Sequence, residues 1–370
     1  MTLVAKGIQP SKIIMKTGPV ASFLFVCLLL CTGLLGGCTE RPLSGNQKHD
    51  KLKNETPELL VYNGSTMGTS YQVKIALENT STPKSLAEKI NNRLESLDKT
   101  FSTYKKTSEL MEFNQSEINQ PKPISDDMQR VMKLASEMHG LTRGTFDPTI
   151  APLVNLWGFG PKYTGDEIPD PEEINQYLLS MGLHHLSLDQ NAKTATRNTD
   201  LQLDLSAIAK GYAVDAVAEL LASTGIENYL VEVGGELRAS GKKQNGEPWR
   251  IAIEKPSLSQ GDIEQVVNLE DVAVATSGDY RNYFEKNGKR YSHTIDPRTG
   301  YPVDHRLASV TVIAATAARA DALATAMMVM GPEQTLLFAE QHSIPVYILV
   351  KQAEAFEAQY SEAFSGYFSE

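Results

Sequence analysis

Hydrophobic and polar positions alternate over residues 69–76, which is the pattern of a half-buried β-strand. Over residues 86–101 the apolar positions recur every three or four residues, which predicts an amphipathic helix capped by Ser85. The same two periods predict further elements, the helices over 128–138, 207–222 and 317–330 and the strands over 201–205, 229–233, 250–254, 272–276, 310–314 and 346–350. Short strands joined partly by turns and interspersed with helices favour an α+β fold, with mixed or antiparallel sheets covered by helices.

An apolar run near the N-terminus follows three lysines and ends in the sequence LGGC at residues 35–38. A basic segment, a short apolar segment and small residues before a cysteine are typical of the signal peptide of a bacterial lipoprotein. We therefore expect a signal over residues 1–37, lipidation of Cys38, and a flexible polar tether over 38–58. The alternative is an ordinary signal anchor with a coincidental cysteine.

The chain has 370 residues, a formal net charge of −10 and an ordinary proportion of apolar and charged residues. The acidic balance argues against nucleic-acid binding, and the single long apolar run argues against a polytopic membrane protein. No cysteine follows Cys38. The expected globular domain over 59–351 and the expected tail over 352–370 therefore contain no disulfide, thiolate zinc site or cysteine nucleophile.

Asp321 and Thr325 are four residues apart, on one face of a predicted helix that is otherwise rich in alanine and methionine. A carboxylate and a hydroxyl are hard oxygen ligands, which suit Mg²⁺ completed by water or phosphate oxygens. The alternative is a surface aspartate beside a threonine that bonds back to its own helix. The sequence leaves both interpretations open.

Residues 204–211 (DLSAIAKG) run from a predicted strand into a predicted helix, where free N–H groups and Lys210 favour a bound anion. Asp204 as a helix cap beside a solvated Lys210 is an equally good interpretation. His293 precedes the turn at 296–300 (DPRTG) and is a candidate general base or phosphate contact, although it is also consistent with a structural histidine.

Two further segments combine glycine with polar or aromatic residues. These are 64–71 (GSTMGTSY) and 144–149 (GTFDPT), the latter followed by the aromatic segment 156–160 (LWGFG). They would let a planar ligand approach, but they are equally consistent with a β-bulge and with core packing. Taken together, five segments rich in glycine and oxygen and free of cysteine favour an oxygen-ligated metal with a phosphate-bearing ligand.

These segments resemble the ApbE family, and they occur in that family's order. The motifs are GSTMGTSY (64–71), STYKKTSEL (102–110) with Asn114, GTFDPT (144–149), LWGFG (156–160), DLSAIAKGYAVD (204–215), VGGE (233–236), TSGDY (276–280), SHTIDPRTG (292–300) and DALATA (321–326). The family comprises FAD:protein FMN transferases, formerly called thiamine biosynthesis lipoproteins. The resemblance implies an ApbE-like α+β fold with FAD in a cleft between two lobes.

The resemblance also implies roles for individual residues. The FAD contacts would be Met67, Tyr104, Thr145, Phe146, Asp147, Asp204, Lys210 and Ile295. Mg²⁺ would be held by the carbonyl oxygen of Ala207 and by Asp321 and Thr325. The catalytic residues near the reacting phosphates would be His293 and Lys210.

The implied reaction uses Mg²⁺, transfers FMN from FAD to a Thr or Ser hydroxyl of a target protein, and releases AMP. The implied targets are subunits of Na⁺-translocating NADH:quinone reductase or Rnf-type complexes, at the periplasmic side of the inner membrane. Thr39 after the lipidated cysteine leaves sorting to the outer membrane open. The alternatives are a Mg²⁺-dependent FAD pyrophosphatase with the same pocket, and a non-catalytic flavin-binding lipoprotein.

Overall fold

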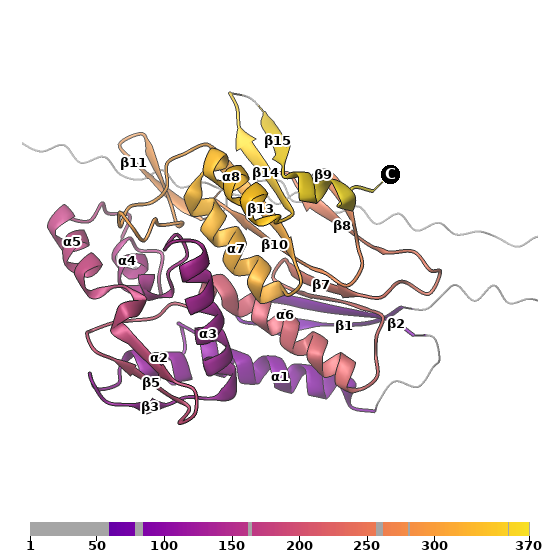
Figure 1. Ribbon diagram of the computed structural model, residues 1–370, viewed down its shortest axis with the longest axis horizontal. Coiled ribbons are helices and arrows are strands. Elements are labelled where there is room, and N and C mark those ends of the chain that lie inside the picture. Colours follow the sequence, from indigo (N-terminus) through magenta and orange to yellow (C-terminus); the bar gives the residue numbers. More distant parts are fainter. Residues whose placement is uncertain are drawn as a thin grey trace, which may run out of the picture. The chain divides into compact units, whose positions relative to one another are not determined.

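Eight strands form the main sheet, and every neighbouring pair in it is antiparallel. The computed structural model describes residues 59–77, 84–161, 165–256, 262–279, 282–353 and 355–369. The order across the sheet (Figure 1) is β1 (Leu59–Thr66), β2 (Thr69–Ala76), β6 (Tyr229–Val233), β7 (Glu236–Ser240), β10 (Ala273–Gly278), β13 (Leu307–Ala314), β14 (Val346–Lys351) and β15 (Phe356–Tyr360). The expected signal over 1–37, the lipidated Cys38 and the tether over 38–58 lie outside the described residues and stay predictions.

Residues along the central strands alternate between two hydrophobic cores, one on each face of the sheet. In β14, Val346, Ile348 and Val350 enter the core shared with the helices, whereas Tyr347 and Leu349 enter the core on the other face. Because both faces are buried, this strand is a continuous apolar run, and the side-chain period of two decides only which core each residue joins.

Four helices cover one face of the sheet, namely α1 (Leu86–Phe101), α6 (Ser206–Ser223), α7 (Ala317–Met330) and α8 (Pro332–His342). α6 and α7 lie side by side (Figure 1), and α3 (Asp126–Leu141) and α2 (Glu109–Asn114) pack beside this layer. Alanine-rich faces let α6 and α7 approach closely. They are in close contact at Gly211, where an added Cβ would lie 2.3 Å from the backbone oxygen of Ala317.

Replacing Gly211 with alanine is expected to destabilise the fold by about 1–3 kcal/mol, the usual cost of overpacking. The added Cβ would meet backbone atoms of Ala317 and Ala318, so one of the two helices must move. The midpoint of urea unfolding measures the effect. Gly140→Ala is the matched control, since Gly140 in α3 has open space at its Cβ position and alanine there should stabilise by about 0.5–1 kcal/mol. An unchanged midpoint for Gly211→Ala would contradict the tight contact.

The other face of the sheet is covered by a hairpin and by the C-terminal segment. The hairpin comprises β8 (Trp249–Glu254) and β9 (Ile263–Leu269), and the 3₁₀ helix η3 (Glu362–Tyr367) buries Phe364 beside them. The segment after residue 351, expected as a tail, therefore belongs to the folded domain through β15 and η3. The hydrophobic pattern after residue 351 does not predict this strand, because β15 is a short edge strand that is mostly exposed and lacks the apolar run of a central strand.

The remaining elements are short. A three-stranded sheet has the order β3 (Lys122–Pro123), β5 (Thr194–Arg197) and β4 (Leu186–Asp189). A third core around Trp157 joins α4 (Ala151–Leu156), α5 (Pro171–Ser180) and the hairpin of β11 (Tyr283–Lys286) and β12 (Lys289–Ser292), next to the 3₁₀ turns η1 (Pro148–Ile150) and η2 (Leu183–His185). Within the described ranges, no helix combines the length and the apolar character that a membrane span requires.

The helices over 207–222 and 317–330 are confirmed, but the strand expected over 201–205 is wrong. Asn114 takes the place of a strand partner there, because its Nδ2 donates to the carbonyl of Leu203 and its Oδ1 accepts from the Leu203 N–H, both at 2.8 Å. Asn114 thus satisfies both backbone groups of Leu203, Arg197 donates to the carbonyl of Leu201, and no strand ladder forms. The helix over 86–101 is present, but the side chain of Ser85 makes no capping hydrogen bond.

Candidate functional site

A cavity of about 480 Å³ lies against the first turns of α6 and the part of α7 from Asp321 onward, a size that suits a small-molecule ligand. Its walls also include the end of β10, the segment after α3 and the segment after β12. All but one of the residues expected to contact FAD, Mg²⁺ or the reacting phosphates line it, namely Tyr104, Thr145, Phe146, Asp147, Asp204, Ala207, Lys210, His293, Ile295, Asp321 and Thr325. The cleft between two lobes stays a prediction, because the described residues from 59 onward group as one compact unit.

Met67 is the expected FAD contact that does not line this cavity. It lies in the tight turn between β1 and β2, where it has a left-handed φ of 49° and is followed by Gly68 with a φ of 75°. Its half-buried side chain packs against the main core. The segment therefore serves as a hairpin turn, and the contact between Met67 and flavin stays a prediction.

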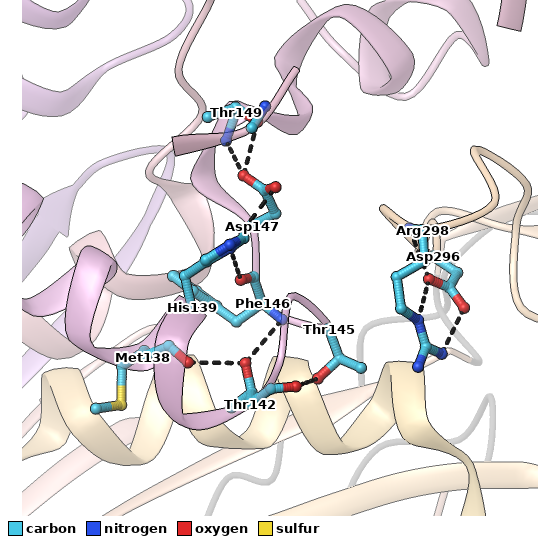
Figure 2. A network of polar contacts seen from close by, with 10 residues as sticks. Met138, His139, Thr142, Thr145, Phe146, Asp147, Thr149, Asp296 and Arg298 are labelled. Carbon is cyan, nitrogen blue, oxygen red and sulfur yellow. Dashed lines mark hydrogen bonds and ion pairs between the residues drawn. The ribbon is translucent and has the colours of Figure 1, made fainter. Parts of the chain in front are cut away.

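The segment after α3 is held rigidly by side-chain hydrogen bonds (Figure 2). Thr142 Oγ1 accepts from the N–H of Phe146 at 3.1 Å, and His139 Nδ1 lies 3.0 Å from the Phe146 carbonyl oxygen. Asp147 Oδ1 accepts from both the N–H and the hydroxyl of Thr149, at 2.8 and 2.7 Å. These contacts determine which atoms of this segment face the cavity, so a ligand would meet a preformed wall.

Asp204 lies one residue before Leu205, the N-cap of α6, so it is not the helix cap itself, and Lys210 pairs with Glu236 rather than being solvated. Asp204 nevertheless accepts a hydrogen bond at the start of the helix. Its Oδ1 accepts from the N–H of Ser206 at 2.8 Å, and its own N–H donates to the carbonyl of Pro148 at 2.8 Å. The residue therefore joins the start of α6 to the segment after α3. Since a helix N-terminus favours negative charge, a phosphate group in this part of the cavity would be stabilised.

Lys210 from α6, Glu236 from β7 and Asp321 from α7 line the same cavity. The Lys210 ammonium forms an ion pair with Glu236, which is only 2% exposed. Burial raises the pKa of Glu236 and of Asp321, and Lys210 offsets only part of this rise. Burial lowers the pKa of Lys210, but the two carboxylates outweigh it and raise the pKa overall. Because the pKa of both buried carboxyl groups is raised, one of them tends to take up a proton while Lys210 is the only cation beside them, and a further cation would favour the ionised form of both.

The oxygen atoms of Ala207, Asp321 and Thr325 fit a hard dication. Asp321 Oδ2 accepts from the N–H of Gly211 at 3.0 Å. In a regular α-helix that N–H donates to the carbonyl of Ala207, so sharing it with Asp321 leaves the Ala207 oxygen able to bind a cation. Thr325 Oγ1 lies 3.2 Å from Ser277 Oγ. Among the described residues no cluster of three or more His, Cys, Asp or Glu encloses a metal position, so water or ligand oxygens would complete the coordination.

His293 lines the cavity with one ring nitrogen committed to the backbone. Its Nδ1 lies 3.0 Å from the carbonyl oxygen of Asn282, so Nδ1 carries the hydrogen and Nε2 keeps its lone pair. Burial lowers the pKa of His293, and the hydrogen bond to Asn282 offsets part of that effect. A neutral imidazole with this tautomer can accept a proton at neutral pH.

Glu236, Ser277 and Asn282 line the cavity, although no role was expected for them. Glu236 and Ser277 belong to the motifs VGGE and TSGDY, but these short motifs do not distinguish a site from an ordinary turn. Asn282 contributes its backbone carbonyl, which every residue type possesses. These three residues are identified as cavity residues only by the packing of β7, β10 and the segment before β11 around α6 and α7.

Sequence comparison identifies relatives of the whole domain. The sequence model of the ApbE family matches residues 67–348. The chain is 46% identical over 308 residues to the FAD:protein FMN transferase of Vibrio cholerae serotype O1, an alignment that covers 83% of this chain and 92% of that protein. It is 39% identical over 349 residues to the FAD:protein FMN transferase of Escherichia coli strain K12, covering 94% of this chain and 97% of that protein.

Solved structures resemble the same domain. The flavin transferase ApbE from Vibrio cholerae matches with a TM-score of 0.77 and 43% identity, over 84% of this chain and 99% of that one. The Pseudomonas stutzeri flavinyl transferase ApbE, in its apo form, matches with a TM-score of 0.78 and 41% identity, over 84% of this chain and 97% of that one. These matches confirm the expected α+β fold class. The chain belongs to the ApbE family.

Proposed function

We propose that this protein is an FAD:protein FMN transferase, which transfers FMN from FAD to a Thr or Ser hydroxyl of a target protein and releases AMP. The observation that carries the proposal is that Lys210, Asp321 and His293 line one cavity. Together they offer a fixed cation, a buried hard-oxygen ligand and a neutral base. Relatives named FAD:protein FMN transferase, similar over almost their whole length, support the same substrate.

The apolar part of the cavity suits the flavin ring system. Tyr104 lines the cavity and is 74% exposed, so a planar ligand would cover its ring. Phe146, Phe159 and Ile295 add apolar surface to the same cavity. A ring bound here would leave the pyrophosphate for the polar side, where the charged residues lie.

In the proposed step, the oxygen of the acceptor hydroxyl bonds to the FMN-side phosphorus. The bond from that phosphorus to the bridging oxygen breaks, and AMP leaves with the bridging oxygen. Nε2 of His293 receives the hydroxyl proton, and the Lys210 ammonium holds positive charge beside the phosphates. Positioning and charge neutralisation of this kind are the main sources of catalysis in phosphoryl transfer.

The proposal includes a requirement for Mg²⁺, which would offset the negative charge of the pyrophosphate. The carbonyl oxygen of Ala207 and the side chains of Asp321 and Thr325 would hold the ion. Two neighbouring groups orient these ligands, since Gly211 donates to Asp321 and Ser277 shares a hydrogen bond with Thr325. The ligands would thus be positioned before the substrate binds.

We further propose that the acceptors are subunits of Na⁺-translocating NADH:quinone reductase or Rnf-type complexes. Lipid attached to Cys38 would anchor the enzyme at the periplasmic side of the inner membrane. The lipoprotein-type sequence around residues 35–38 supports the anchor. Thr39 leaves the outer membrane as the alternative destination.

Co-expression of the chain with a candidate acceptor subunit should attach flavin covalently to that subunit. Mass spectrometry should show an increase equal to FMN less one water, at a Thr or Ser, and AMP should appear in equal amount. The control is an acceptor whose target hydroxyl residue is replaced by Val or Ala. Release of FMN at the same rate with and without acceptor would instead indicate a pyrophosphatase, and binding of intact FAD without release a flavin-binding lipoprotein.

A further inference from the structure

Lys210 lies near two buried carboxylates, Glu236 and Asp321, but forms an ion pair with only the first. In the part of the chain that the structure describes, Asp321 has no ion-pair partner, and its Oδ2 accepts from the N–H of Gly211, the residue next to Lys210. All three charged side chains line one cavity. If Lys210 forms an ion pair with one of these carboxylates, the other remains available to a different cation.

The turn before β7 favours the pairing with Glu236. Gly234 has a φ of 62°, and a Cβ there would lie 3.3 Å from Lys210 Cδ, so the glycine backbone packs against the lysine side chain. Gly235 follows with a φ of 104°, and its N–H donates to Glu232 Oε1 at 2.8 Å. These contacts fix the turn and bring Glu236 to the ammonium at the end of the packed side chain.

We propose that Glu236 is a positioning residue, which holds the Lys210 ammonium away from Asp321 and so keeps the Asp321 carboxylate available to a divalent cation. This inference rests on the proposed function, which places that cation at Asp321. Without negative charge at position 236, Asp321 would be the nearest buried anion to Lys210. An ion pair is strong in surroundings of low polarity, so the ammonium would compete with the cation for the same oxygen atoms.

Only Oε1 of Glu236 forms the ion pair with Lys210. Its Oε2 is buried and has no hydrogen-bond partner among the described residues. A direct contact between that oxygen and the cation would also make Glu236 important for metal binding. The two roles differ in whether the effect of Glu236 depends on Lys210, and a double variant separates them.

The test is a titration of the full-length chain with Mn²⁺ alone, in which the EPR signal of free Mn²⁺ reports binding without any flavin. Glu236→Gln should raise the dissociation constant of Mn²⁺ about tenfold, because the ammonium moves to Asp321. In the double variant that adds Lys210→Met, the constant should return to within about threefold of the wild-type value, because the competing ammonium is gone.

Glu232→Gln is the matched control. It removes a nearby negative charge, while its amide oxygen can still accept from the N–H of Gly235. Its Mn²⁺ dissociation constant should stay within about twofold of the wild-type value. Thermal unfolding of each variant verifies that it is folded before its affinity is compared.

Three results would overturn the inference. These are unchanged Mn²⁺ affinity in Glu236→Gln, affinity that stays weak in the double variant, and absence of Mn²⁺ binding by the wild-type chain. None of them decides the proposed function, which depends on whether the wild-type chain flavinylates an acceptor. Conversely, a wild-type chain that transfers no flavin but shows the expected Mn²⁺ pattern would leave the role of Glu236 in place.

Discussion

Flavin transfer should fall about 100-fold or more when Asp321 is replaced by asparagine. Asparagine has nearly the same shape, and its side-chain oxygen can still accept from the N–H of Gly211, so α6 and α7 should stay packed. The variant loses the negative charge that would hold Mg²⁺ against the pyrophosphate. The measurement is the initial rate of acceptor flavinylation at several Mg²⁺ concentrations, and the Mg²⁺ concentration for half-maximal rate should rise.

Glu333→Gln is the control for this change, because Glu333 is an exposed acid at the start of α8 and lies outside the cavity. It should transfer flavin at the wild-type rate. FAD binding to Asp321→Asn, followed by flavin fluorescence, separates a loss of metal from a loss of substrate. Retention of more than a tenth of the wild-type rate at low Mg²⁺ would remove Asp321 from the proposed metal site.

Flavin transfer should fall about 100-fold to 10,000-fold when His293 is replaced by glutamine, the usual contribution of a general base. Glutamine can keep a hydrogen bond to the carbonyl of Asn282, but it cannot accept the hydroxyl proton. Wild-type flavinylation should lose rate only on acidification below about pH 6.5, because burial lowers the pKa of His293 from its ordinary value. The base is active in its neutral form, so the rate is full above the lowered pKa and falls below it.

The loss of flavin-transfer rate at acidic pH distinguishes a general base from a structural histidine. In His293→Gln, the residual rate should lack this dependence between pH 5 and 8. His342→Gln, on the exposed end of α8, is the control and should keep the wild-type profile. A His293→Gln variant within tenfold of the wild-type rate, or one with the wild-type pH profile, would assign the proton to another group.

Local sequence patterns predicted most of the elements that build the site. The helix over 317–330 is α7 itself, and the helix over 207–222 differs from α6 by one residue at each end. These helices could be predicted because their apolar and alanine-rich composition extends over many residues, and Gly331-Pro332 marks where α7 ends. The strand expected over 201–205 is wrong because Asn114, far away in the sequence, hydrogen-bonds the backbone of Leu203 where a neighbouring strand would otherwise pair.

In the candidate site, too, local patterns predicted some features, whereas others depend on contacts between distant segments. The motifs identified Asp321, Lys210 and His293 as chemically notable, yet each also had a plain structural interpretation. The structure brings them to one cavity, and it adds Glu236 and the backbone carbonyl of Asn282, which no pattern had distinguished. It places Met67 in a hairpin turn away from the cavity lining. Such outcomes depend on which segments pack together, and a local period carries no information about that.

The family, the α+β class and the residue types available for chemistry could be predicted from the sequence alone, because these depend on motifs and on patterns within one segment. Which carboxylate pairs with Lys210, and which amide orients Asp321, depends on how distant segments pack in the folded chain. The hydrogen bond between Gly211 and Asp321 joins residues 110 positions apart. It exists because a glycine lets α6 and α7 come together on the sheet, and that close approach is a property of the packed helices rather than of either segment alone.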